Sequence, residues 1–119
     1  MILIVASNKE LSSVWARHLE RQHYDVHVVT SQEDAVDFLC EDEPEVLLLD
    51  VMLEDGSAIA TADFASYRRP NTRIVFVTRS SFFSDGSLFQ HIPNTCAIIP
   101  ERTNPTDLAE IVAYHGRAS

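Results

Sequence analysis

Asp50 is the residue of this chain whose position in the sequence most strongly indicates a chemical role. It ends the continuous apolar run Val46–Leu49, which has the length and composition of a strand covered on both faces. A carboxylate at the tip of such a strand loses hydration, so it is costly there unless a cation or a basic side chain pairs with it. The alternative is an ordinary solvent-facing loop Asp, and the residues around it decide between the two.

Other residue types that often carry chemistry give weaker signals. Cys40 and Cys96 have no Cys-x-x-Cys spacing and fall in apolar runs, which predicts two buried, reduced thiols. Among five His residues only His23 and His27 are closely spaced, and they flank a helix-to-strand turn instead of sharing a helical face. The three glycines form no Gly-rich turn that could hold a nucleotide or flavin phosphate. We therefore expect no metal and no cofactor.

Five short β-rich runs are the elements that must position Asp50. They recur at intervals of about twenty residues, which leaves room for a helix between each pair. The runs are Ile2–Val5, Val26–Val29, Val46–Leu49, Ile74–Val77 and Ala97–Ile99. Strands that alternate with helices in this way predict a parallel sheet with helices on both faces.

Two capping-box patterns predict where the first helices begin. Ser7 is followed three residues later by Glu10, and Thr30 by Glu33, each before an apolar stripe at helical spacing. The first helix should begin near Ser7 or Asn8.

The remaining helices have signals of unequal strength. An Ala-rich helix is expected at about 57–68, and Asn104-Pro105 should open a last helix that stops at Gly116. The segment 80–93 has turn character and predicts a short or broken helix.

Length and composition indicate one ordinary folded domain over residues 1–119. Of the residues, 45% are hydrophobic and 23% charged, which argues against disorder. The formal charge of -9 repels both a phosphate backbone and an anionic membrane surface, so nucleic-acid and membrane binding are not expected. There is neither a basic leader before Ile2 nor an apolar stretch near the roughly 20 residues that span a bilayer, so we expect a cytoplasmic protein.

The residues at the predicted strand ends point to a family. The run Leu47-Leu48-Leu49-Asp50-Val51-Met52-Leu53-Glu54-Asp55-Gly56-Ser57, with Val77-Thr78 after the fourth strand, resembles the receiver domain of two-component response regulators over nearly the whole chain. The resemblance implies a flavodoxin-like α/β fold with a five-stranded parallel sheet in the order 2-1-3-4-5.

The resemblance also assigns roles to single positions. Asp50 stands in the place of the phospho-acceptor. Thr78 stands in the place of the switch residue, whose hydroxyl moves in response to the phosphoryl group. The family's acidic pair, which holds Mg²⁺, corresponds to Ala6 and Ser7, and its lysine after the fifth strand to Glu101. The chain therefore keeps the acceptor position but lacks the residues that neutralise charge during phosphoryl transfer.

Glu101 would bring a second negative charge toward Asp50, and like charges at close range destabilise each other. We expect a basic side chain to intervene. The candidates are Arg79, Lys9 and Arg102.

Residues near the predicted fourth helix suggest a partner surface. Phe82, Phe83, Leu88, Phe89 and Ile92 are more large apolar residues than a short or broken helix can cover, which predicts an exposed patch around Phe82, Phe83 and Phe89. The partner would be another signalling protein or a second copy, bound through the predicted fourth helix, the fifth strand and the last helix. Ile98 replaces the family's frequent aromatic switch residue, so this surface should be constitutively available.

The sequence thus favours a non-enzymatic receiver-like domain that acts by phosphorylation-independent protein–protein interaction. Two alternatives stay open. One is a functional phosphorelay receiver phosphorylated on Asp50, and the other is a small-molecule sensor that uses the vacated acidic pocket.

Overall fold

The computed structural model describes residues 1–78 and 92–117 of the chain. Strands and helices alternate in the order β1 (Ile2–Val5), α1 (Lys9–Glu20), β2 (Val26–Val29), α2 (Gln32–Glu41), β3 (Val46–Asp50), α3 (Ala58–Arg68), β4 (Arg73–Thr78), β5 (Thr95–Pro100) and α4 (Pro105–Arg117). The strands are parallel and lie in the order β2-β1-β3-β4-β5. This confirms the predicted fold class, whereas the predicted fourth helix falls almost wholly outside the described residues.

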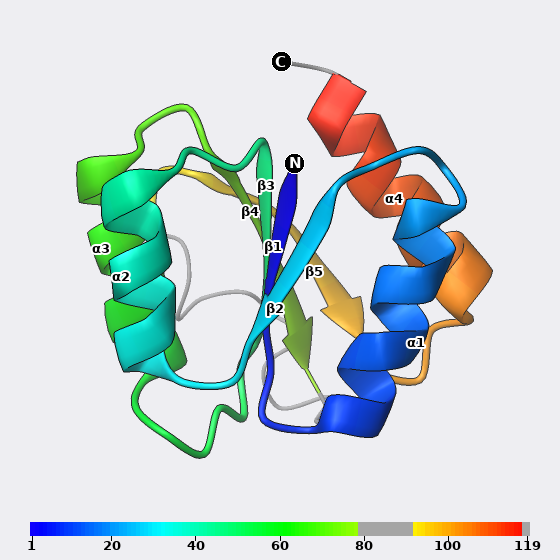
Figure 1. Ribbon diagram of the computed structural model, residues 1–119, viewed down its shortest axis with the longest axis horizontal. Coiled ribbons are helices and arrows are strands. Elements are labelled where there is room, and N and C mark those ends of the chain that lie inside the picture. The colour runs from blue at the N-terminus through cyan, green and yellow to red at the C-terminus, as the bar shows by residue number, and fades with distance from the viewer. Residues whose placement is uncertain (79–91, 118–119) are drawn as a thin grey trace.

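The sheet is covered on both faces. Helices α2 and α3 pack on one face, and α1 and α4 on the other (Figure 1). Because successive strand residues point to opposite faces, Leu47, Leu49 and Phe76 face the α2–α3 layer, while Leu48 and Val75 face the α1–α4 layer. The central strands β1 and β3 are buried along their whole length, as their continuous apolar sequences predicted.

The first helix begins at the cap Asn8, one of its two expected starts, and the second begins one residue later than its capping box predicted. Asn8 is extended and its Oδ1 accepts the N–H of Leu11 at 3.1 Å, while Ser31 Oγ accepts the N–H of Asp34 at 3.1 Å. Ser7 is therefore not the cap of α1, although Asn8 was the other expected start. The third helix begins as expected, because Ser57 caps Ala58–Arg68.

The last helix begins as predicted but does not stop at Gly116. Asn104 Oδ1 accepts the N–H of Thr106 at 2.9 Å, and the helix continues to Arg117. Gly116 is helical, and a Cβ there would lie 3.2 Å from the hydroxyl of Tyr24, which donates to the carbonyl of Ala113. Close packing, not helix termination, accounts for this glycine. No helix in the described ranges is both long and apolar enough to cross a membrane.

The expectation that both thiols are buried was wrong for Cys40. Leu39 faces the core, and Cys40, one position further round α2, is exposed. Cys96 is half-buried in β5, and its Sγ donates to the carbonyl of Ile74 at 3.4 Å. Burial raises the pKa of the Cys96 thiol, and the positive charge of Arg73 only partly opposes this.

The two thiols should therefore react at different rates. Because the thiolate is the nucleophile, and Cys96 is both shielded and poor in thiolate, we expect Cys40 to be alkylated at least about ten times faster at neutral pH. Mass spectrometry of the native protein after timed iodoacetamide exposure measures the two rates. Equal rates would contradict this prediction, and Cys40→Ser should remove the fast phase alone.

Candidate functional site at the carboxyl edge of the sheet

The register of β1 and β3 brings three of the predicted site positions together. Val5 pairs with Leu49, so Ala6 and Ser7 follow directly beside Asp50 at the carboxyl edge of the sheet. In open parallel sheets this edge is where ligands and chemistry gather.

Asp50 is buried, with 2% of its surface exposed, so it is not a solvent-facing loop residue. Its Oδ1 accepts the N–H of Met52 at 2.9 Å, and the N–H of Val51 donates to the carbonyl of Val77 at 2.9 Å. The acceptor position is therefore held by its own loop and by the neighbouring strand β4.

Ser7 has a role that the sequence did not reveal. Its Oγ accepts the backbone N–H of Glu54 at 2.8 Å, which ties the loop after Asp50 to the end of β1. Ala6 beside it is fully buried and offers no polar side-chain atom. At the two positions where the family resemblance places carboxylates, this chain thus has a methyl group and a hydroxyl that holds a loop.

The same loop is fixed from its other side by α2. The N–H of Gln32 donates to the carbonyl of Asp55 at 2.9 Å, and Gln32 Oε1 accepts the N–H of Ser57 at 2.8 Å. Gly56 between them has a φ of +111°, and a Cβ there would lie 2.3 Å from Gln32 Cβ. Only glycine fits such a backbone. We call Ser7 and Gln32, with their hydrogen bonds to the loop 51–57, together with Gly56 in that loop, the loop clamp.

Ser7→Ala tests the loop clamp. We expect a loss of about 0.5–1.5 kcal/mol in the free energy of unfolding, the usual net contribution of one hydrogen bond. Urea unfolding followed by the fluorescence of Trp15, the chain's one tryptophan, measures it. Ser13→Ala is the matched control, because Ser13 is an exposed residue of α1, and its loss should change stability by less than about 0.5 kcal/mol. An equal effect of the two substitutions would argue against the clamp.

Strands β4 and β5 contribute the other half of the site. Thr78 is buried at the end of β4, next to Val77, which pairs with Asp50. Its carbonyl accepts the N–H of Glu101 at 2.7 Å, so the half-buried Glu101 lies at the same edge, on the far side of Thr78 from β3.

The candidate counter-charges to Asp50 are placed only in part. Lys9 is exposed at the first residue of α1, and Arg102 is exposed after β5. Arg79 lies outside the described residues. Pairing of Asp50 with one of these side chains stays a prediction.

The donor set at this edge lacks the acidic pair of the Mg²⁺ site that the family resemblance implies. Beside Asp50, Ala6 has no donor atom and the Ser7 hydroxyl is already bonded to Glu54. Mg²⁺ binds through oxygen ligands, carboxylates above all, in near-ideal octahedral geometry. Over residues 1–78 and 92–117, no group of three or more His, Cys, Asp and Glu side chains could hold a metal.

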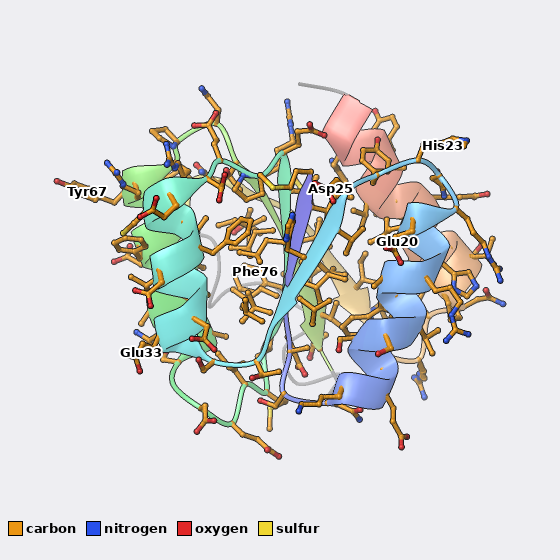
Figure 2. All side chains as sticks on the ribbon, viewed as in Figure 1. Glu20, His23, Asp25, Glu33, Tyr67 and Phe76 are labelled. Atoms are coloured by element: carbon orange, nitrogen blue, oxygen red, sulfur yellow. The ribbon has the colours of Figure 1, made fainter. Side chains whose placement is uncertain are left out.

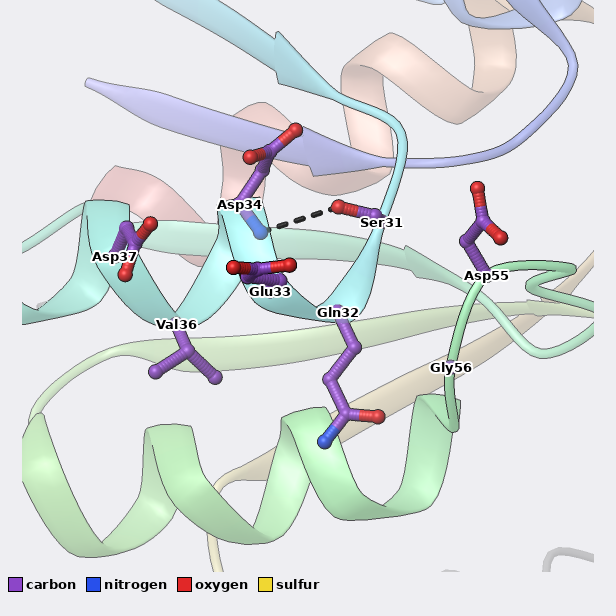
Figure 3. Close-up of a pocket in the computed structure, with 8 residues that line it drawn as sticks. All are labelled: Ser31, Gln32, Glu33, Asp34, Val36, Asp37, Asp55 and Gly56. Carbon is purple, nitrogen blue, oxygen red and sulfur yellow. Dashed lines mark hydrogen bonds between the residues drawn. The ribbon is translucent and has the colours of Figure 1, made fainter.

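A separate acidic depression lies at the start of α2 (Figure 3). It has a volume of about 660 Å³ and is lined by Ser31, Gln32, Glu33, Asp34, Val36, Asp37, Asp55 and Gly56. Glu33 and Asp34 occupy the first turn of the helix, where negative charge is favourable because of the helix dipole. The depression does not include Asp50, and helix stabilisation explains its charge.

The predicted partner face is described only at its borders. Ile92 is buried against the core that α2 and α3 cover, and Ile98 is half-buried. Phe82, Phe83, Leu88 and Phe89 lie outside the described residues. On α4, Tyr114 is exposed beside a depression of about 650 Å³ that Ile111 and His115 also line.

Comparison with known proteins agrees with this geometry. The model of the response regulator receiver domain matches residues 2–86. The chain belongs to this family. The match confirms the family that the residues around Asp50 suggested. Receiver domains are generally non-enzymatic signalling modules that interact with other signalling proteins.

Solved receiver structures share the fold closely. A CheY-like receiver domain protein from Methanospirillum hungatei is 22% identical with a TM-score of 0.88, over 98% of this chain and 93% of that one. The receiver domain of NtrX from Brucella abortus is 14% identical with a TM-score of 0.89, over 100% of both chains. A response regulator from Burkholderia pseudomallei, solved with a phosphorylated aspartic acid, a calcium ion and citrate, is 17% identical with a TM-score of 0.80, over 98% of this chain and 68% of that one.

Proposed function

We propose that this receiver domain signals without aspartyl phosphate, through protein–protein contacts that do not depend on phosphorylation of Asp50. The observation that carries the proposal is the bond from the Glu54 N–H to the Ser7 hydroxyl, beside the fully buried Ala6. The two positions next to the acceptor supply a structural contact and an apolar side chain in place of carboxylates.

Electrostatics supports the proposal. Phosphoryl transfer to a carboxylate builds negative charge on the transferred group, and receivers depend on a cation and an ammonium to offset it. Here the position of the ammonium carries Glu101, half-buried at the same edge as Asp50. A phosphoryl group on Asp50 would add charge to a site that already has two carboxylates.

The loop clamp supports the proposal that the protein–protein contacts do not depend on phosphorylation. Phosphorylation changes the output of a receiver only if the residues around the acceptor can rearrange in response to it. In this chain the loop after Asp50 is bonded to β1 through Ser7 and to α2 through Gln32. Such a loop favours one output conformation, available to partners at all times.

Incubation with acetyl phosphate and Mg²⁺ tests the proposed function. We expect no acid-labile mass increase by intact-mass spectrometry, and no difference between the native chain and Asp50→Asn. A receiver of known phosphorylation, treated in the same reaction, is the positive control. A stoichiometric adduct that Asp50→Asn removes would overturn the proposal and favour a functional phosphorelay receiver.

A further inference from the structure

We propose that the open edge of β2 and the adjoining groove on α1 bind an extended acidic peptide segment of another protein, which adds to the sheet as a sixth strand. The proposal does not depend on the proposed function, since neither Asp50 nor the loop clamp takes part in it. It rests on the backbone direction of β2, the composition of this edge and the charges that line the groove.

The backbone of β2 presents bonding groups to the open edge. The N–H of Ile2 donates to the carbonyl of Asp25, and the N–H of Ala6 to that of Val29, so odd-numbered residues of β2 form the ladder with β1. In a parallel ladder the alternate residues turn their N–H and C=O groups the other way. For Val26 and Val28 this is the edge of the sheet, because β2 is its terminal strand.

The β2 edge is short, at four residues, but it has no Lys, Arg, Asp, Glu or proline and no bulge to protect it. Natural edge strands carry charged residues, prolines or bulges that prevent pairing with another chain. Strand β2 has the sequence Val-His-Val-Val, and Val28 is 41% exposed. The opposite edge strand β5 has both a register irregularity beside Ile74 and Val75 and a terminal proline, Pro100. In Figure 1 the strand β2 lies in front of the others, with α1 and α2 on either side of it.

A groove beside the β2 edge indicates the chemistry of the added strand. It has a volume of about 470 Å³ and is lined by Lys9, Ser12, Ser13, Ala16, Arg17 and Glu20 of α1, with Val28 and Thr30. Lys9 and Arg17 are exposed cations on a chain with a net charge of -9. Because side chains of a strand alternate between faces, every second residue of an added strand would point toward this groove. Acidic residues at those positions complement Lys9 and Arg17, and apolar residues between them would lie on the α2 face, next to His27 and Phe38.

A second copy of this chain does not fit the same edge. Two β2 strands paired antiparallel about a two-fold axis would place α2 beside α2 of the other copy, on the same face of the joined sheet. The helix α2, with the sequence QEDAVDFLCE, has four carboxylates and no Lys or Arg. Like charges would therefore repel across that contact. An acidic peptide with an apolar opposite face avoids this repulsion.

Titration with designed peptides tests the proposal. The probe is an acetylated and amidated heptapeptide in which valine and glutamate alternate, and the control peptide has lysine in place of glutamate. We expect the glutamate peptide to bind at least about tenfold more tightly, although the net charge of the protein favours the lysine peptide. Amide NMR shifts should map to β2 and α1 and should leave α3 unchanged. Equal affinities, or tighter binding of the lysine peptide, would overturn the proposal.

Variants separate the groove from the general charge of the protein. Arg17→Glu should weaken binding of the glutamate peptide about fivefold, while Arg102→Glu, with the same charge change outside the groove, should change it less than twofold. Val28→Pro removes an outward N–H and should abolish binding, whereas Val28→Thr keeps it. If Val28→Pro fails to fold, the arginine pair still decides. Equal effects of the two arginine variants, or a dimer by sedimentation with NMR shifts at β2, would refute the peptide as occupant.

Discussion

The triple variant Ala6→Asp, Ser7→Asp, Glu101→Lys is expected to accept a phosphoryl group from acetyl phosphate in the presence of Mg²⁺, where the native chain accepts none. It supplies two carboxylates beside Asp50 and replaces a negative charge by an ammonium at the same edge of the sheet. Removal of one group that stabilises charge in a transition state commonly lowers a rate by about 10²–10³-fold. Restoring all of them together should therefore raise the rate by at least that factor.

Each single substitution in this set should have little effect. Cation and ammonium act on the same transferred group, and residues that act as a unit are strongly non-additive. Asp50→Asn in the triple background is the control that assigns the adduct to Asp50. Ser7→Asp should preserve the bond to the Glu54 N–H, because a carboxylate oxygen also accepts hydrogen bonds. A triple variant that folds but stays unmodified would show that the loop or Thr78, and not only charge, prevents the reaction.

Phe76→Ala should produce a large loss of stability, about 3–5 kcal/mol in the free energy of unfolding. Phe76 is fully buried in β4, between the sheet and the α2–α3 layer. Its removal leaves a cavity that the other side chains of this core, such as Leu49 on the adjacent strand, fill only in part. Guanidinium unfolding measures the change.

Tyr67→Ala is the matched control for Phe76→Ala, because Tyr67 is an aromatic residue on α3 with 85% of its surface exposed. Figure 2 shows the two rings, one inside the molecule and one directed outward. Its removal should change stability by less than about 0.5 kcal/mol. The fluorescence of Trp15, which is buried in the α1–α4 layer, reports on the face opposite Phe76. A Trp15 transition unaffected by Phe76→Ala would mean that the two layers unfold separately.

The fold could be predicted from sequence because its strongest signals are local. The continuous apolar runs around Leu48 and Val75 mark strands buried on both faces, and the spacing between runs leaves room only for crossover helices. Helix starts were less certain, since Ser7 and Asn8 both have side chains suited to capping. The deciding factor was a contact with Glu54, 47 residues away, which no local pattern contains.

The candidate site could be predicted as a set of positions but not as an arrangement. Asp50, Thr78 and Glu101 follow apolar runs, so their positions at the strand ends could be predicted from the sequence. The role of Gln32 could not, because a glutamine in the first turn of a helix gives no signal of the loop it binds. The need for glycine at position 56 was not predictable either, because Gln32, the residue that leaves no room for a side chain there, is distant in sequence.

The loop clamp has a consequence for attempts to transplant segments between receivers. The three clamp residues come from three separate segments, and Gln32 leaves room at position 56 for glycine alone. A foreign β3–α3 loop of different length or with a bulkier residue at position 56 would collide with Gln32. A chimera that exchanges this loop alone should therefore express poorly, and one that also carries the donor's residues at positions 7 and 32 should recover.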